Sequence, residues 1–564
     1  MADSFLLCKL TSPMRSFPRF LAVRVFLATA WLAGVGSVSI SSFASAYNGR
    51  PKLVVIIVID QFRGDYLERY RDQFGDAGFR FLLDHGAYFS NCNYNYANTR
   101  TAPGHATLFT GAYSNGHGIA ANQWWDQKKK RMVTSVEDDT TRLIGVEGDK
   151  PGSSPHNLLA DTLGDELKLA TQGKSRVFGI SMKDRAAILP AGFSGDAAYW
   201  IDPQTGAWVT STYYRNELPR WVQDFNSTRP EKFWDRDWKD AQGVMLRSTA
   251  HRKRKDGSEA GFYEVVGSTT FGNEYEFAFA KELVVYENVG RGPATDLLSI
   301  SLSPNDILGH QVGPDSPELQ QMALDLDRQL ADFINFVGHQ IGLADVWIAL
   351  SADHGVSSLP DQVRKLRIPA ANLDTAKIEA SLNAAIASRF SAHSAAYVKL
   401  DFPLAWLDPD AFATAHVREH DAETAVGEAM RQAGLLDFFT KSQLAAGEAP
   451  NTPLGRKYLN SFTPEGSWYV MGVPEIYTVG TGKGTDHNSP YNYDTHVPLA
   501  IYGLPFQAGT YRISVEPVDL VPTLASLLGI NAPTHSVGRV LTEAFAPQHH
   551  GTAAPGAHSG EPQP

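Results

Sequence analysis

The residues best suited to chemistry are carboxylates and imidazoles that lie far apart along the chain, together with one threonine. Each follows a short apolar run or lies in a loop, and a parallel sheet gathers such positions at one edge. Zinc accepts mixed oxygen and nitrogen ligands, and two zinc ions about 4 Å apart stabilise both the attacking and the departing oxygen of an in-line displacement. We therefore predict a two-zinc phosphoryl-transfer site, whose candidate residues are Asp60, Thr101, Asp306, His310, Asp353, His354 and His487.

These candidates differ in how specific their sequence context is. Asp306 and His310 are four residues apart, so one helical turn would place both side chains on one face, although such pairs are common on protein surfaces. Asp353-His354 comes directly after an apolar run and before a glycine, which favours metal ligation over packing. His487 lies in a Gly-rich segment and, taken alone, fits an ordinary loop histidine.

Three apolar runs predict the strands that position these residues. Residues 53–59, 296–302 and 345–351 are typical of central parallel strands covered on both faces, and each is followed by a candidate carboxylate. Between the last two runs, Ser316 and Pro317 predict the N-cap and first residue of a helix. This order predicts an α/β fold with a doubly wound, mostly parallel central sheet flanked by helices and carrying cap insertions.

We predict one catalytic domain over residues 47–545, interrupted by two insertions. The first, at about residues 190–290, is rich in aromatic residues, most of which we expect to pack in a small core of the insertion itself. The second, at about residues 358–475, contains a helical pattern from 375 to 390. The first insertion is placed to overhang the site as a cap.

The core resumes after the second insertion and ends shortly before the C-terminus. Residues 497–502 predict a returning strand, and residues 518–528 predict a last helix. Residues 546–564 are rich in Pro, Gly, His and Ala, which predicts a disordered tail.

The first 46 residues predict a cleaved signal peptide. Three arginines precede an apolar run over residues 25–43, which ends at the small residues Ala44-Ser45-Ala46. An uncleaved anchor is the alternative, but glycines and serines make the run weakly apolar, so we expect no stable membrane anchor. These features predict a secreted or periplasmic protein.

The charge balance excludes some partners. The formal net charge is −11, and the predicted signal peptide holds four of the 50 basic residues but only one of the 61 acidic ones. An acidic chain gives no footprint for nucleic acid or for an anionic membrane, because binding to those surfaces needs a basic face. Cys92 is the only cysteine beyond the predicted signal peptide, so no internal disulfide is expected.

In order and spacing, the motifs resemble those of the alkaline phosphatase superfamily, and within it the secreted bacterial phosphomonoesterases that use a threonine nucleophile. The resemblance spans the catalytic core from about residue 50 to 530 and covers the insertions loosely. It rests on residues 58–63 (VIDQFR), 98–106 (NTRTAPGHA), 109–111 (FTG), 117–119 (HGI), 306–310 (DILGH), 351–355 (SADHG) and His487.

The resemblance implies two bound Zn²⁺ ions, one held by Asp60, Thr101, Asp353 and His354 and the other by Asp306, His310 and His487. Thr101 would also be the nucleophile, and the Ala-Pro-Gly-His that follows it favours an exposed, strained turn. Manganese or iron would also suit such oxygen-rich sites. Sulfatases of the same superfamily need Cys or Ser at the nucleophile position, so sulfate ester hydrolysis is disfavoured.

Lys183 and Arg185 bear on the substrate class. A phosphate monoester is a dianion, and these two cations with the amide of Asn122 would neutralise its non-bridging oxygens. A diester has one charge fewer and a bulky group where the cations would lie. The resembled phosphomonoesterases carry a Lys-x-Arg loop here, whereas the related nucleotide pyrophosphatases and phosphodiesterases lack it. We therefore expect hydrolysis of small-molecule phosphate monoesters, with broad specificity, through a covalent phosphothreonine.

Three other functions stay open. A nucleotide pyrophosphatase or phosphodiesterase would use the same two-zinc site and differ at Lys183 and Arg185. A transferase would hand the phosphoryl group to an acceptor other than water, and such enzymes usually carry several membrane spans. A non-catalytic metal-binding protein would have no need of the nucleophile.

Overall fold

The computed structural model describes residues 51–391, 396–480 and 482–546. The predicted signal peptide and all of the predicted C-terminal tail except Ala546 lie outside the described residues. No helix in the described ranges has the length and apolar character needed to cross a bilayer.

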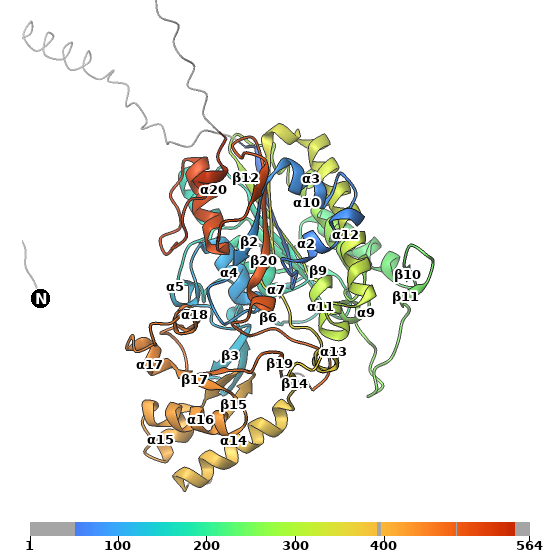
Figure 1. Cartoon of the computed structure of the whole chain (residues 1–564). Helices are drawn as coiled ribbons and strands as arrows, with labels where there is room; N and C mark the ends of the chain where they lie inside the picture. Colours follow the sequence, from blue (N-terminus) through green and yellow to red (C-terminus); the bar gives the residue numbers. More distant parts are fainter. Residues whose placement is uncertain (1–50, 392–395, 481, 547–564) are drawn as a thin grey trace, which may run out of the picture. The chain divides into compact units, whose positions relative to one another are not determined.

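An eleven-stranded sheet forms the centre of the fold (Figure 1). Its middle strands β13, β1, β12, β7 and β8 are parallel neighbours, and every residue of β1 is buried, as its run of branched apolar residues predicts. In order across the sheet the strands are β21 (Gly509–Tyr511), β2 (Ala87–Asn93), β20 (His496–Tyr502), β13 (Val346–Ser351), β1 (Leu53–Ile59), β12 (Asp296–Leu302), β7 (Val177–Ser181), β8 (Ala197–Ile201), β9 (Trp208–Ser211), β5 (Glu137–Ile144) and β6 (Pro151–Ser153).

Helices cover both faces of this sheet. Figure 1 shows α3, α10 and α12 on one side and α4 and α20 on the other. The side chain of Ser316 accepts a hydrogen bond from the Leu319 N–H and caps α12, as predicted. The helices of the core are α3 (Phe79–His85), α4 (Thr101–Thr110), α6 (Leu163–Ala170), α7 (Asp184–Ala191), α10 (Thr270–Tyr286), α11 (Pro304–Val312), α12 (Pro317–Gln340) and α20 (Leu520–Leu528). The predicted α/β fold class is confirmed.

The predicted core strands agree closely with the structure. Strands β1 and β12 have the predicted bounds, and β13 begins one residue later because Asp345 ends a 3-10 turn. The returning strand is β20, which runs antiparallel to β13. The last helix begins at Leu520, after the 3-10 turn Pro517–Asp519.

The second insertion forms a separate layer with its own antiparallel sheet and hydrophobic cluster. Helix α14 has the predicted bounds. The elements of this layer are β15 (Val398–Asp401), β16 (Leu404–Leu407), β18 (Tyr469–Val473), β17 (Asp437–Thr440), α14 (Thr375–Phe390), α15 (Pro409–Thr414), α16 (Glu419–Gln432), α17 (Lys441–Ala445) and α18 (Pro453–Ser461), and the pair β14 (Ala371–Asn372) and β19 (Thr478–Val479) lies beside it.

The first insertion is joined to the core more closely than expected. Strands β8 and β9 extend the central sheet, and Trp208 stacks on Phe279 of α10 with ring centroids 4.0 Å apart. The aromatic residues pack mostly against one another within the insertion, as expected, but this cluster is continuous with the main hydrophobic core. Large rings fit the space between the sheet extension and α10, which the sequence pattern did not reveal.

Shorter elements connect these layers. They are α2 (Tyr66–Arg69), α5 (Ser114–His117), α8 (Arg220–Thr228), α9 (Phe262–Val265), α13 (Pro360–Lys365), α19 (Asn492–Thr495), and the antiparallel pairs β3 (Gln123–Asp126) with β4 (Arg131–Thr134) and β10 (Asp237–Lys239) with β11 (Met245–Ser248).

Candidate active site

Four parallel strands bring the candidate residues to one edge of the sheet. Strands β13, β1, β12 and β7 are neighbours, so their carboxyl ends lie together. A doubly wound sheet binds its ligands at this edge. The side chains that follow these strands are Asp353 and His354 after β13, Asp60 after β1, Asp306 in α11 after β12, and Lys183 after β7.

Asp60, Asp353 and His354 form what we call the inner half-site, and all three are completely buried. His354 Nε2 lies 3.6 Å from Asp60 Oδ1 and 3.6 Å from Asp353 Oδ2. None of these three atoms has a hydrogen-bond partner among the described residues. Because an unpaired buried polar atom is costly, three such atoms within 4.8 Å of one another fit a metal ion.

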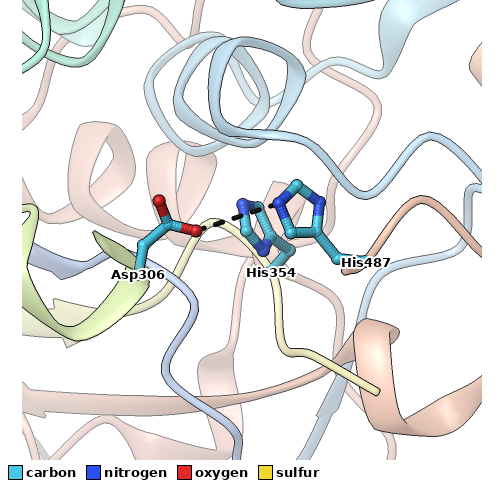
Figure 2. Close-up of side chains that lie close together, drawn as sticks. All are labelled: Asp306, His354 and His487. Carbon is cyan, nitrogen blue, oxygen red and sulfur yellow. Dashed lines mark ion pairs between the residues drawn. The ribbon is translucent and has the colours of Figure 1, made fainter. Parts of the chain in front are cut away.

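Asp306, His310 and His487 form the outer half-site. Asp306 Oδ1 lies 3.1 Å from His310 Nε2, so α11 presents the two side chains on one face as their spacing predicts. The same oxygen lies 3.8 Å from His487 Nε2. Figure 2 shows the ring of His354 beside that of His487, and the ring centroids are 3.7 Å apart, so the two half-sites adjoin.

The three histidines are oriented by backbone carbonyls. Nδ1 of His310 lies 3.0 Å from the Thr485 oxygen, and Nδ1 of His354 lies 2.9 Å from the Gly355 oxygen. Nδ1 of His487 lies within hydrogen-bond distance of the Thr99 oxygen. A carbonyl accepts only from N–H, so Nε2 of each neutral ring keeps its lone pair for a metal.

The charge balance of the site also fits metal ions. The Lys183 ammonium donates to Asp60 Oδ2, 2.7 Å away, and to Asp306 Oδ2. Burial lowers the pKa of Lys183, but the carboxylates of Asp306 and Asp60 outweigh it and raise that pKa above its ordinary value. Burial and the carboxylates of Asp306 and Asp353 raise the pKa of Asp60 well above its usual range. The site therefore holds more carboxylate charge than Lys183 balances.

Thr101 is the first residue of helix α4, and only 1% of its surface is exposed. The prediction of an exposed, strained turn is therefore wrong. Pro103 is tolerated because backbone N–H groups in the first helical turn have no partner within the helix. The positive end of the α4 dipole lies at Thr101, where it favours an anionic group.

Helix α4 packs directly on the inner half-site. A Cβ atom on Gly104 would lie 2.6 Å from the Asp353 Cβ, so this close approach requires glycine. His105 Nδ1 lies 2.8 Å from the Thr101 carbonyl oxygen and 3.3 Å from Asp353 Oδ2. Arg100, which precedes the helix, is held by the side chain and carbonyl of Asp401 in the second insertion. Both layers of the fold thus fix the start of α4.

The remaining predicted residues surround the same place. Asn122 Oδ1 accepts a hydrogen bond of 2.8 Å from the Ala102 N–H, next to Thr101. Arg185 contacts the neighbouring Asp184 at 3.6 Å, and its Nε is buried without a partner among the described residues. The donors of Arg185 are therefore suited to an anionic ligand.

Several residues of the site carried no sequence signal that identified them. Asp486 lies with His310 and His487 in a third group of closely spaced ligand atoms. Glu276 of α10 is fully buried and accepts from the N–H groups of Met182 at 2.8 Å and Ser303 at 3.2 Å. It thereby ties together the ends of β7 and β12, and burial raises its pKa to about 8.

Comparisons with known proteins agree with this geometry. Residues 54–447 match the family described as type I phosphodiesterase / nucleotide pyrophosphatase. Alkaline phosphatase PhoV of Synechococcus elongatus is 33% identical over 88% of this chain and 93% of its own length. A Myroides odoratus protein named calcium-transporting ATPase is 33% identical over 90% of this chain and 97% of its own length.

A solved structure extends the likeness to three dimensions. The crystal structure of wild-type alkaline phosphatase PafA superposes with a TM-score of 0.80 at 31% identity, covering 88% of this chain and 99% of that one. The chain belongs to the type I phosphodiesterase / nucleotide pyrophosphatase family of the alkaline phosphatase superfamily, and it is a PafA-like phosphoric monoester hydrolase.

Proposed function

We propose that this chain is a secreted, zinc-dependent alkaline phosphatase that cleaves small-molecule phosphate monoesters through a covalent phosphothreonine at Thr101. The observation that carries the proposal is the convergence of three unpaired, completely buried ligand atoms in the inner half-site, against which the Thr101 helix packs. Secretion rests on the predicted signal peptide at residues 1–46.

Two zinc ions fit the donor set of carboxylate oxygens and imidazole nitrogens. When bound, they would lower the pKa of the attacking hydroxyl and stabilise the departing alkoxide. Asp60, Asp353 and His354, with Thr101, would hold one ion. The outer half-site, made of Asp306, His310 and His487, would hold the other.

The chain's own residues account for two successive displacements at phosphorus. The Thr101 hydroxyl loses its proton and its oxygen forms a bond to phosphorus while the bond from phosphorus to the ester oxygen breaks, and the departing alcohol gains a proton. Water then loses a proton and attacks the phosphothreonine, the bond to the Thr101 oxygen breaks, Thr101 regains its proton, and inorganic phosphate leaves. Two in-line displacements give net retention of configuration at phosphorus.

Three groups would bind the transferred phosphoryl group. Lys183 lies between the half-sites, Arg185 offers its Nε, which has no hydrogen-bond partner among the described residues, and Asn122 lies beside the start of α4. Two cations and an amide suit the dianion of a monoester better than the monoanion of a diester. The description of the matched family favours the alternative of a nucleotide pyrophosphatase or phosphodiesterase acting at the same two-zinc site.

The test is acid quenching of the metal-loaded enzyme during turnover of a ³²P-labelled monoester, followed by peptide mapping. We expect label on the peptide that contains Thr101, no label in Thr101→Ala, and label retained in Thr101→Ser, which keeps a hydroxyl. Label on another residue, or turnover without any label, would overturn the proposed intermediate.

A further inference from the structure

Gln61 directly follows Asp60 and has a backbone conformation that is costly for its residue type. It is completely buried, and its φ is +65°, in the left-handed region that favours glycine. Such conformations persist only where the surroundings impose them, and they cluster at functional sites.

In this conformation Gln61 contacts a carboxylate in each half-site. Its backbone N–H donates to Asp353 Oδ1, 3.1 Å away in the inner half-site. Its side-chain Nε2 donates to Asp306 Oδ1, 2.7 Å away in the outer half-site. The His354 backbone N–H donates to the same Asp353 Oδ1 at 3.0 Å, and these two contacts leave Asp353 Oδ2 as the oxygen that faces the His354 ring. Gln61 therefore helps to orient a carboxylate in each half-site.

Gly309 of helix α11 leaves the space that the Gln61 side chain occupies, and a side chain at position 309 would collide with it. A Cβ atom on Gly309 would lie 2.0 Å from Gln61 Oε1, and the nearest atom outside Gln61 would be in Leu319 at 3.8 Å. Asn305 of the same helix donates to the Asp60 carbonyl oxygen at 2.9 Å, which fixes the peptide that enters Gln61. Helix α11 and Gln61 are thus fitted to each other.

We propose that Gln61 is a positioning residue that joins the two half-sites, and that its strained backbone is retained because it holds both carboxylates in the orientation needed to bind two metal ions. This role rests on the proposed two-metal function. Residues that hydrogen-bond metal-ligating carboxylates affect metal affinity by about 10- to 100-fold. Gln61 contacts the carboxylates that would hold the metal ions, so its effect should appear in metal binding itself.

Gln61→Gly provides a test with two effects of opposite sign. Glycine keeps the backbone N–H and removes the strain but deletes the amide. Gln61→Ala is the matched control, because it loses the amide and keeps the strain. Both variants lose the buried side chain, so we expect chelator-treated Gln61→Gly to unfold at a higher temperature than chelator-treated Gln61→Ala. Zinc affinity, measured by competition with a chelating indicator, should fall about 10- to 100-fold in both variants.

Gly309→Ala extends the test into a double-mutant cycle. In the wild-type background the added methyl displaces the Gln61 amide, so zinc affinity should fall. In the Gln61→Gly background the methyl has room, so it should cause no further loss. Unchanged zinc affinity in Gln61→Gly, or additive losses in the double variant, would overturn the role of Gln61. If the wild type itself bound no zinc, the proposed function would fail instead, which is a distinct result.

Discussion

The two half-sites differ in burial and in how far their ligand atoms are already paired. The inner half-site is completely buried, and its converging atoms have no hydrogen-bond partner among the described residues. In the outer half-site 34% of the His310 side chain is exposed, and Asp306 already contacts Lys183, Gln61 and His310. The inner half-site thus keeps three converging atoms without hydrogen-bond partners among the described residues, although Lys183 pairs with the other oxygen of Asp60, whereas Asp306 of the outer half-site is contacted through both oxygens.

The difference in burial and hydrogen bonding indicates that the two half-sites bind their ions with different affinities. A buried set of unpaired atoms gains most from binding an ion, because the ion removes a large desolvation cost. The more exposed half-site is better placed to meet a leaving group and to exchange with solvent. We therefore expect the inner ion to bind tightly beside the nucleophile and the outer ion to bind more weakly.

The largest effect should follow from changing one ligand in each half-site. Asp353→Asn should lower kcat/KM for a monoester on the order of 10⁴-fold, as expected for a group that acts as a unit with the nucleophile. His310→Gln should lower it roughly 10²- to 10³-fold, comparable to losing one transition-state contact. Steady-state kinetics of the two variants checks this, and a larger loss in His310→Gln would reverse the assignment.

Lys183→Ala and Arg185→Ala should separate the substrate classes. We expect each to lower kcat/KM for an aryl phosphate monoester by about 10²- to 10³-fold, because each removes a cation from the dianion. The matching diester should be affected much less. Lys168→Ala, which removes an ion pair with Asp196 away from the site, is the control. Equal losses on both substrates would show that the two cations do not select monoesters.

Chelator titration should remove the two ions in separate steps. The first zinc equivalent to be removed should come from the outer half-site, and its removal should abolish most of the activity. The second should leave at a higher chelator concentration and lower the unfolding temperature. An ion present at 1,000 times its dissociation constant stabilises the fold by about 4 kcal/mol. Metal analysis at each step checks the order, and loss of both ions in one step would remove the distinction between the half-sites.

The smallest effect concerns Glu276, which supports the strand ends that carry Lys183 and the outer half-site. Its folded pKa is raised from 4.5 to about 8 by burial. Between these values the folded protein binds the proton and the unfolded chain does not, so stability falls as pH rises through this window. Gln has no carboxyl group to ionise, so the stability of Glu276→Gln should not fall over this pH window.

The free energy of unfolding of Glu276→Gln should therefore rise relative to the wild type between about pH 5 and pH 8. Urea unfolding of both proteins at several pH values measures this difference. Glu282→Gln, on the same helix and only partly buried, is the control and should run parallel to the wild type. A constant difference for Glu276→Gln would contradict the assigned cause.

The sequence predicted the elements whose signals are local. The apolar run before Asp60 and the Ser316-Pro317 helix start both behave as their residue types require. The candidate metal ligands could be proposed because most of them follow strands that a parallel sheet gathers. Pro103 and Gly104 suggested a loop after Thr101, but the structure shows that both lie in the first turn of helix α4.

Other features depend on contacts between distant segments and have no local signature. Glu276 accepts from backbone N–H groups of two strand ends, which any residues could supply. Gln61 has a left-handed backbone that its sequence neighbours do not impose. The aromatic residues around Trp208 pack mostly on partners within the insertion, including Phe279 of α10, but their sequence does not show that β8 and β9 join the central sheet. Tertiary packing, and not propensity, decided each of these.

The most direct measurement is kcat/KM of the zinc-loaded protein on an aryl phosphate monoester and on the matching diester, side by side, with a chelator-treated control. If the chain is a two-zinc phosphomonoesterase, kcat/KM should be much larger for the monoester, and this activity should disappear on chelation and return when zinc is added. Preference for the diester would leave the fold and the metal ligands in place but would make the chain a phosphodiesterase. Turnover that survives full removal of metal would contradict the two-zinc site itself.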